Sequence, residues 1–460
     1  MTQAKPDLKT TVGKLQDLRN RLTEAAQPMG AEAIEATHAA GRLTARETLL
    51  ALLDEGSFVE TDALARHRAT DFKMERTRPA TDGVVTGYGT VEGRRVVAYA
   101  IDETVFEAAL GEVYAEKILK LYDLAAKSGV PIVAFLAGTG PRLKEGVVTL
   151  SMFAKIVNAA ADASGLVPQI SVINGETSGL HAVLANLADL VIASDARAHL
   201  VAEPADFPVV TRAVLGHLPL NNMAEAPRTE TPEKPAGIDL NTIIPDEGDY
   251  DVRALLGELV DGGLLEVRAQ AGAGVITGFA RIGGRAVGVV ATDPAAQLDA
   301  ESATKAARFI RTADSFNLPI LQVVDTDGFP AGDEESLRAA AQLAYANAEA
   351  SVGKLTLITR RAYGSGYVLF GAKDTGADLV WAWPTAEVAV DSAENVAAAL
   401  GTDAEKYAAE HLNPYRAAER GLVDAVIEPA DTRTFIIDGL GLTERKVVAR
   451  RPRKHGNIAL

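Results

Sequence analysis

The sequence predicts an α/β fold made of two tandem copies of one unit. Short apolar strands alternate with helical segments along most of the chain, a pattern that is typical of α/β proteins. Segments of the first half recur in the second half at a nearly constant distance, and a proline-rich segment lies between the halves. The length of 460 residues also favours two domains, because a typical domain holds roughly 100–200 residues.

The first half begins with a helical region and continues with paired strands. Residues 12–54 are expected to be helical, because Leu15, Leu18 and Leu22 recur at helical spacing. Two strands are expected over 84–90 and 96–100, on either side of a turn at Glu92–Gly93. The alternation then predicts a helix over about 112–128, a strand over 132–136, a helix over about 145–163, a strand over 170–173 and a helix from about 178.

The predicted domain organisation is an N-terminal domain over residues 1–225, a linker over 226–250 and a C-terminal domain over 251–460. The linker holds Pro227, Pro232, Pro235 and Pro245 among charged and small residues. Nothing in this segment recurs at helical or strand spacing, and proline fits the interior of neither element.

The repeat indicates an internal duplication. Residues 275–279 echo 84–88, residues 318–320 echo 130–132, and residues 377–380 echo 188–191. Gly364 is matched with Gly175, at a distance of 189 residues. An ordered set of matches over this length favours two copies of one unit. Two unrelated α/β domains that happen to look alike are the alternative.

The composition excludes several classes of protein. A net charge of −16 argues against a nucleic-acid partner, because an acidic chain repels phosphate backbones. The chain has no cysteine and no HExxH pair among its seven histidines, so no metal site is expected. No apolar run reaches the roughly 18 residues of a membrane span, and the N-terminus lacks the apolar core of a signal peptide. We therefore expect a cytoplasmic protein without membrane contact.

One segment in each half has the layout of a ligand-binding turn. Residues 171–181 and 357–367 each run from an apolar strand through small residues into a helix. Small residues let a ligand approach the backbone, and the first N–H groups of a helix lack internal partners. Such a turn favours an anion or a developing oxyanion, and a tight turn without a ligand is the alternative. His181 is expected to be a packed helix residue rather than a base.

Four long motifs resemble those of one protein family. His38–Glu47 is similar to an H-x-x-G-K-L-T-A-R-E segment, and Ala163–Ser171 to A-S-G-x-I-P-Q-I-S. Thr359–Gly364 resembles T-R-K-A-Y-G, and Ala418–Asp424 resembles A-E-R-G-x-V-D. These segments are typical of the carboxyltransferase (β) subunits of biotin-dependent propionyl- and acetyl-CoA carboxylases. The resemblance covers nearly the whole chain and implies two crotonase-like domains.

The resemblance implies a reaction that backbone donors support. The N-terminal half would bind acyl-CoA, and the C-terminal half of a neighbouring subunit would bind carboxybiotin. Carboxybiotin releases CO2, the freed ureido nitrogen takes the α-proton of the thioester, and the resulting enolate attacks CO2. Two backbone oxyanion holes stabilise the enolate and the ureido oxygen, and one such donor can contribute roughly 3–4 kcal/mol.

The site residues implied by the resemblance fall in three groups. The acyl oxyanion hole is placed at Gly179 and Leu180, and the biotin oxyanion hole at Ser365 and Gly366. Acyl-CoA binding is assigned to Gly138, Thr139, Gly140, Arg142 and Ser178. Biotin binding is assigned to Asp325, Gly328, Gly364 and Tyr367.

The chain departs from the family at the site, which leaves three functions open. Glu107–Ala108 stands where the family has paired glycines, Leu180 and Ser365 each replace a glycine, and Asp327 replaces a proline. A family block is missing between about 207 and 215, and a few residues are missing after Gly332. The chain is expected to be a carboxyltransferase. A biotin-independent malonyl-type decarboxylase or other enolate enzyme, and a non-catalytic partner subunit, are the alternatives.

The partners implied by the resemblance are other protein chains. The sequence holds neither the A-M-K-M segment that carries biotin nor a glycine-rich ATP loop. Biotin would therefore be carried on a separate protein and be carboxylated by a separate biotin carboxylase. The family arrangement also implies a homo-oligomer, with a hexamer of stacked dimers as the expected assembly.

Overall fold

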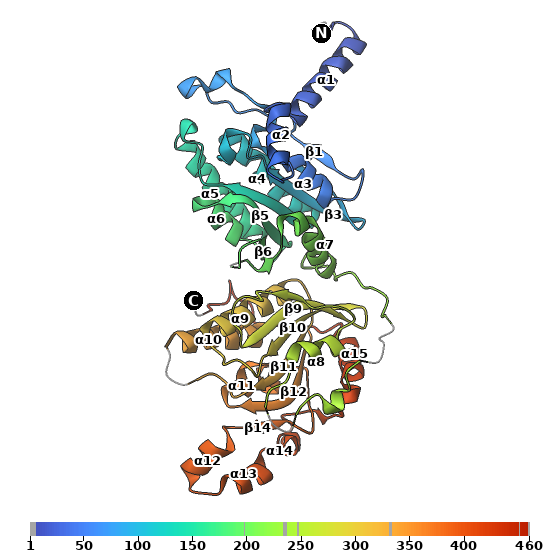
Figure 1. Cartoon of the computed structure of the whole chain (residues 1–460), viewed down its shortest axis with the longest axis vertical. Helices are drawn as coiled ribbons and strands as arrows, with labels where there is room; N and C mark the ends of the chain where they lie inside the picture. The colour runs from blue at the N-terminus through green and yellow to red at the C-terminus, as the bar shows by residue number, and fades with distance from the viewer. Residues whose placement is uncertain are drawn as a thin grey trace. The chain divides into compact units, whose positions relative to one another are not determined.

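The computed structural model describes residues 6–196, 198–232, 237–245, 248–330, 334–449 and 451–458. It divides into two compact units, of which the first contains residues 1–215 and 220–222 and the second contains 216–219 and 223–460 (Figure 1). Within the described residues, none of the helices has both the length and the apolar character that crossing a bilayer requires.

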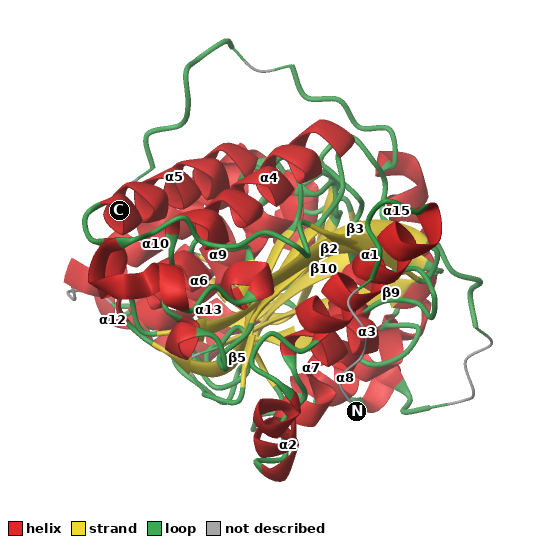
Figure 2. Ribbon diagram, turned by 90° about the horizontal axis from the view of Figure 1, so that it is seen from above, coloured by secondary structure: helices red, strands yellow, loops and turns green. Residues whose placement is uncertain are grey.

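The first half of the chain forms one mixed sheet and its helices. The helices are α1 (Thr11–Ala26), α2 (Ala31–Ala39), α3 (Ala45–Leu52), α4 (Glu112–Ser128), α5 (Val148–Ala163), α6 (Gly179–Asn186) and α7 (Phe207–His217). The strands are β1 (Val59–Thr61), β2 (Val84–Val91), β3 (Arg94–Ile101), β4 (Ile132–Gly138), β5 (Gln169–Thr177), β6 (Leu190–Ala193) and β7 (Leu200–Val201). Helices α4 and α5 lie side by side, and α4 packs against β2 and β3 (Figure 2).

The second half forms a second sheet. Its helices are α8 (Val252–Leu259), α9 (Ala300–Ser315), α10 (Glu334–Glu349), α11 (Ser365–Leu369), α12 (Ala393–Leu400), α13 (Ala404–His411), α14 (Pro414–Glu419) and α15 (Thr432–Thr443). Its strands are β8 (Leu265–Val267), β9 (Val275–Ile282), β10 (Arg285–Thr292), β11 (Ile320–Thr326), β12 (Lys354–Tyr363), β13 (Leu379–Ala382), β14 (Glu387–Ala389) and β15 (Ala425–Val426). Helices α9 and α10 pair as α4 and α5 do, and α9 packs against β9 and β10.

The two sheets have the same topology. The first has the order β1-β2-β3-β4-β5-β6-β7, and the second has the order β8-β9-β10-β11-β12-β13-β15, with β14 added beside β12. In both sheets the first two pairings are antiparallel and the later ones are parallel. Both also have a register shift at the same place, between Leu136 and Gly138 in β4 and between Val324 and Thr326 in β11. The predicted α/β fold with two tandem units is therefore confirmed.

The local sequence explains most of the expected elements. Helix α4 matches the predicted helix over 112–128, and it ends at Gly129, which takes the left-handed conformation that glycine adopts easily. The region expected to be helical over 12–54 contains three helices instead of one. The breaks fall at 27–30 and 40–44, and Thr44 starts α3 with a capping box that includes Glu47.

One matched pair of the repeat is wrong. Gly175 lies inside β5, whereas Gly364 stands between the end of β12 and the start of α11. The residue in the corresponding place of the first half is Ser178, between β5 and α6. Matched positions of the two halves are fewer residues apart at this turn than at the neighbouring strands. Two glycines that are 189 residues apart were therefore matched although they occupy different places in the fold.

The described part of the predicted linker belongs to the second unit. Arg281 donates a hydrogen bond to the carbonyl oxygen of Pro227 at 2.6 Å, and the Thr229 N–H donates to Gly284 at 3.0 Å. Pro235, and the segment around Gly332 where residues were expected to be missing, lie outside the described residues. The domain limits at 225 and 250 stay predictions.

Each unit contains a buried lysine at the same position of the duplicated fold. Lys117 of α4 donates hydrogen bonds to the carbonyl oxygens of Thr81 and Val84, and Lys305 of α9 donates to that of Ala271 at 3.0 Å. Burial lowers the pKa of Lys117 and of Lys305 to about 8, because a low-dielectric interior disfavours the charged form. Each lysine ties the helix to the segment that precedes the second strand of its sheet.

The pKa of Lys117 predicts a stability that depends on pH. Its folded pKa of about 8 lies below the unfolded value of 10.5, so between these values the unfolded chain binds more protons and stability rises with pH. We expect Lys117→Met to reduce this rise by about 2 kcal/mol between pH 8 and pH 10. Urea unfolding over that range measures it, with the exposed Lys120→Met on the same helix as control. An unchanged slope in Lys117→Met would contradict the prediction.

Candidate active site

The first candidate turn joins β5 to α6. The first helical hydrogen bond runs from the Ala182 N–H to the carbonyl oxygen of Ser178. The N–H groups of Gly179, Leu180 and His181 therefore precede the helical ladder and have no intrahelical acceptor. Gly179 has φ +53°, and a Cβ there would lie 2.8 Å from the carbonyl oxygen of Thr139, so only glycine fits without strain. The side chain of Leu180 is 39% exposed.

The loop after β4 is held beside this turn. The carbonyl oxygen of Gly138 accepts a hydrogen bond from the Ser178 N–H at 3.2 Å. Gly140 accepts from the Leu110 N–H at 3.1 Å, and the Arg142 N–H donates to the carbonyl oxygen of Leu110 at 2.8 Å. The structure thus brings the residues predicted for acyl-CoA and the residues predicted for the acyl oxyanion hole to one end of the sheet.

The guanidinium of Arg142 faces the interior of this unit. It forms ion pairs with Asp82 at 2.8 Å and with Glu145 at 2.6 Å, and it lies 4.3 Å from the centre of the Phe106 ring. Burial raises the pKa of Asp82, although the charge of Arg142 opposes that shift. The charge of Arg142 is therefore used inside the protein, where it anchors the loop. Its assignment to acyl-CoA binding stays a prediction.

The segment with Glu107 and Ala108 keeps a backbone that suits glycine. Phe106, Glu107 and Ala108 have φ values of +50°, +55° and +60°, in the left-handed region, which costs an L-residue about 1–2 kcal/mol. The carbonyl oxygen of Ala108 lies 2.7 Å from the position that a Cβ on Gly138 would take. Side chains at 106–108 therefore adopt a strained backbone conformation beside the acyl turn.

The second candidate turn joins β12 to α11. The first helical hydrogen bond runs from the Val368 N–H to the carbonyl oxygen of Gly364, which leaves the N–H groups of Ser365 and Gly366 outside the helical ladder. The hydroxyl of Ser365 accepts a hydrogen bond from the Phe329 N–H at 2.8 Å. Gly366 is buried, and a Cβ there would lie 2.7 Å from the methyl group of Thr326.

A pocket of about 710 Å³ opens beside the second turn. Its lining contains Asp327, Phe329, Arg361, Tyr363, Gly364, Ser365, Val390, Asp391, Ser392, Glu394 and Asn395. Strand β14 pairs with β12 and brings the 390–395 segment to this pocket. That segment carries no motif, so sequence reasoning missed it, and only the pairing of β14 reveals it.

Of the residues assigned to biotin, Gly364 lines this pocket, whereas Asp325, Gly328 and Tyr367 are absent from its lining. Asp325 is fully buried and accepts hydrogen bonds from Arg360 and Arg361, each at 2.9 Å. Arg361 also contacts Asp327 at 3.2 Å. The Gly328 N–H donates to the Thr326 hydroxyl, and the Tyr367 hydroxyl donates to the carbonyl oxygen of Leu422 at 3.2 Å. Gly364, Ser365 and Arg361 line the pocket, whereas Asp325 is buried outside its lining and positions Arg361 through their ion pair.

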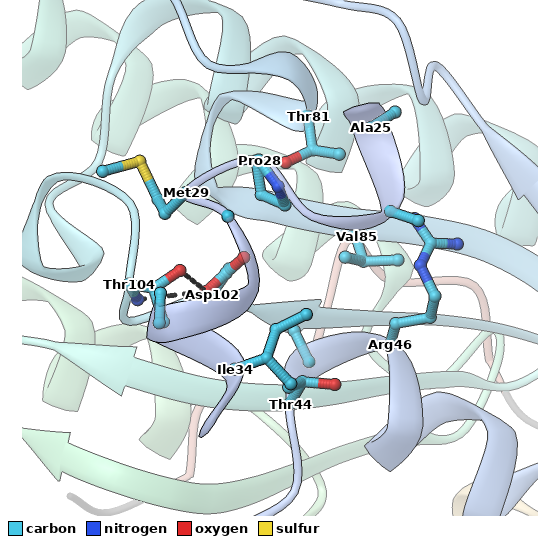
Figure 3. Close-up of a pocket in the computed structure, with 14 residues that line it drawn as sticks. Ala25, Pro28, Met29, Ile34, Thr44, Arg46, Thr81, Val85, Asp102 and Thr104 are labelled. Carbon is cyan, nitrogen blue, oxygen red and sulfur yellow. Dashed lines mark hydrogen bonds between the residues drawn. The ribbon is translucent and has the colours of Figure 1, made fainter. Parts of the chain in front are cut away.

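A second, small pocket lies in the first unit (Figure 3). It has a volume of about 30 Å³ and lies among Met29, Ile34, Thr44, Val85 and Asp102. This volume holds on the order of one or two water molecules. It contains none of the predicted site residues, and the described residues contain no cluster of three or more side chains suited to a metal ion.

Comparisons with known proteins show which family the chain resembles along its length. The carboxyl transferase domain family matches residues 36–205 and 197–458. The chain is 42% identical to the biotin-dependent acetyl-/propionyl-coenzyme A carboxylase beta5 subunit of Mycobacterium tuberculosis (strain CDC 1551 / Oshkosh), over 99% of this chain and 96% of the relative. It is 38% identical to the methylmalonyl-CoA decarboxylase subunit alpha of Veillonella parvula, over 98% of this chain and 100% of the relative.

The solved structures agree with the fold. The transcarboxylase 12S crystal structure, a hexamer assembly with hydrolysed methylmalonyl-coenzyme A bound, has a TM-score of 0.94 and 35% identity and covers 98% of this chain and 99% of that one. The alignment with the mycobacterial subunit spans 529 positions, more than the 460 residues of this chain. The relatives therefore hold residues that this chain lacks, as the missing family blocks indicate.

The left-handed backbone at Ala108 gives a testable prediction. We expect Ala108→Gly to raise the free energy of unfolding by about 1 kcal/mol, because glycine adopts the left-handed region without the Cβ clash. Ala109, the next residue, has φ −68°, so Ala109→Gly should lower stability by about 0.5–1 kcal/mol. Chemical denaturation of both variants measures the contrast, and equal losses in the two would show that residue 108 is not strained.

Proposed function

Because this chain belongs to the carboxyl transferase domain family of biotin-dependent acyl-CoA carboxylases, we propose that it moves a carboxyl group from carboxybiotin to the α-carbon of an acyl-CoA. The observation that carries the proposal is the duplicated strand-to-helix turn. Each unit places N–H groups without helical acceptors at such a turn, Gly179 and Leu180 in one and Ser365 and Gly366 in the other.

The first turn suits the oxygen of an acyl thioester. When the α-proton leaves, negative charge develops on this oxygen, and two aligned N–H groups at a helix start stabilise it. Gly179 places no side chain against Thr139, so the backbone remains accessible. The half-exposed Leu180 side chain lies beside this oxygen and would restrict the acyl chain rather than remove a donor.

The second turn suits the ureido oxygen of biotin. Ser365 lines the pocket of about 710 Å³, and its hydroxyl accepts a hydrogen bond from the Phe329 N–H, whereas its own N–H precedes the helical ladder. When bound, carboxybiotin supplies CO2 by cleavage of its N–C bond, together with a ureido nitrogen that accepts the α-proton. Asp325 holds Arg361 at the pocket wall, where Arg361 also pairs with Asp327.

Decarboxylation is the second candidate, because two relatives of 37–38% identity are named methylmalonyl-CoA decarboxylase subunit alpha. Loss of CO2 from a malonyl-type thioester forms the same enolate and needs only the first turn. Carboxyl transfer needs both turns. Since both turns keep their N–H groups, carboxyl transfer is the function that we propose first. A non-catalytic partner subunit is the function that we rank last.

The partners follow from the proposed reaction. We propose that biotin arrives on a separate carrier protein, which a separate biotin carboxylase charges, and that this chain forms a homo-hexamer. The named carboxylase β subunits and the hexameric transcarboxylase 12S support these proposals. Light scattering at micromolar concentration tests the assembly, and a strictly monomeric mass would contradict it. The cytoplasmic location stays a prediction.

The test of the reaction separates the two enzyme classes. The purified chain is incubated with propionyl-CoA and a carboxylated biotin carrier, and separately with methylmalonyl-CoA alone. Transfer of the carboxyl group to propionyl-CoA that requires the carrier supports the proposal. Turnover of methylmalonyl-CoA alone, without carrier-dependent transfer, would instead support the decarboxylase.

Proline substitutions at the two turns give a sharper prediction. Leu180→Pro and Ser365→Pro each remove one N–H donor at a first-turn position where proline is tolerated, and loss of one oxyanion donor slows an enzyme about 100- to 1,000-fold. Leu180→Ala and Ser365→Ala are the matched controls, because they remove the same side chains and keep the N–H.

We expect Leu180→Pro to impair both carboxyl transfer and any decarboxylation, and Ser365→Pro to impair carboxyl transfer alone. Each alanine variant should retain at least a tenth of the wild-type rate, since its donor is intact. Steady-state kinetics of the four variants measures this. If the proline and alanine variants lose activity equally, the backbone donors are not the source of catalysis.

A further inference from the structure

His181 is the third residue of α6, and its imidazole is the polar group that the proposed reaction has not used. The side chain is 1% exposed. Neither Nδ1 nor Nε2 has a hydrogen-bond partner among the described residues. Buried polar atoms in proteins nearly always have partners, and an orphaned one costs about 1–3 kcal/mol. Two orphaned nitrogens on one ring therefore indicate that a ligand completes this site.

The ring lies between the core and the acyl turn. On one side it meets the Phe153 ring edge-on, with centroids 5.1 Å apart and an interplanar angle of 88°. On the other side, Cε1 and Nε2 lie 3.2 Å from the position that a Cβ on Gly138 would take. The ring edge of His181 therefore faces the backbone of Gly138, the residue whose carbonyl oxygen accepts the Ser178 N–H.

The imidazole is neutral at the pH of the cell. Burial lowers the pKa of His181 to about 4, and the positive end of α6 also disfavours a second positive charge. A neutral imidazole carries one N–H donor and one acceptor nitrogen. Because that donor is a weak acid, it can hydrogen-bond to a developing oxyanion without transferring its proton, and this stabilises the enolate rather than the free enol.

We propose that the Nε2–H of His181 is a third donor of the acyl site, which joins the N–H groups of Gly179 and Leu180 at the thioester oxygen as it becomes an enolate. The proposal deepens the proposed function, on which it rests for the enolate. In the acyl-CoA complex His181 would be a catalytic residue, because its Nε2–H, which is buried in the free chain, would contact the reacting oxygen. It also explains why a polar ring occupies an otherwise apolar place against Phe153.

Two variants of His181 test the proposal. His181→Phe keeps an aromatic ring against Phe153 and removes the donor, whereas His181→Gln keeps an N–H donor. Three quantities are measured for each, namely carrier-dependent carboxylation of propionyl-CoA, decarboxylation of methylmalonyl-CoA without the carrier, and the Kd for propionyl-CoA by calorimetry. We expect His181→Phe to lower kcat 10- to 100-fold with the Kd changed less than threefold, and His181→Gln to recover at least part of that loss.

Other outcomes would overturn the proposal. Wild-type turnover in His181→Phe would show that the donor is not used, and equal loss of kcat and affinity in both variants would show that the ring only supports the fold. A wild-type chain without carrier-dependent transfer overturns the proposed function alone, since methylmalonyl-CoA decarboxylation still reports on His181. Absence of both activities in the wild type overturns both proposals.

Discussion

Each candidate site depends on one constraint, which is that the ends of two adjacent parallel strands meet beside the start of a helix. In the first unit β4 and β5 lose their regular register between Leu136 and Gly138, and in the second unit β11 and β12 do so between Val324 and Thr326. After the shift, the end of β4 lies beside the start of α6, and the segment after β11 lies beside the start of α11. The contact of Gly138 with Ser178 and the contact of Phe329 with Ser365 are consequences of this arrangement.

Buried charges keep both strand ends in place. Arg142 connects the loop after β4 to Asp82 and Glu145, and Asp325 at the end of β11 connects to Arg360 and Arg361. A buried charge that loses its partner costs about 3–5 kcal/mol. Such ion pairs therefore fix the positions of the strand ends more than they add net stability. A site made of backbone donors needs fixed positions, because backbone N–H groups cannot adjust as side chains do.

The sequence predicted those parts of the fold that depend on local pattern. The helix over 112–128 follows from its spacing and its glycine end, and the repeat follows from matched strands, both of which the structure confirms. The strand-to-helix turns at 178–180 and 364–366 also follow from local pattern, because in each segment an apolar strand runs through small residues into a helix. The pairing of Gly175 with Gly364 failed, because residue identity does not reveal a change in spacing between the copies.

The direction of side chains was beyond the sequence. Arg142 lies in the loop after β4 and Asp325 lies near the end of β11, and the family resemblance assigns both to ligand binding. The structure directs Arg142 into the interior and makes Asp325 a support for Arg361, because a buried partner was available to each. The wall formed by residues 390–395 also depends on β14, a strand of three residues whose pairing with β12 joins segments that are distant in the sequence.

The residues that differ from the family motifs show which features of the site depend on the main chain and which depend on side chains. Glu107, Ala108, Leu180 and Ser365 all add a Cβ where the related motifs have glycine, yet the helix starts still present their N–H groups. An oxyanion hole depends on the position of those N–H groups, whereas a Cβ changes only the space around them. The side chains of Leu180 and Ser365 therefore narrow the space beside each turn, while the N–H groups that precede each helix stay in place. The left-handed backbone at 106–108 likewise brings the carbonyl oxygen of Ala108 within 2.7 Å of the position that a Cβ on Gly138 would take, so the main chain itself excludes a side chain there.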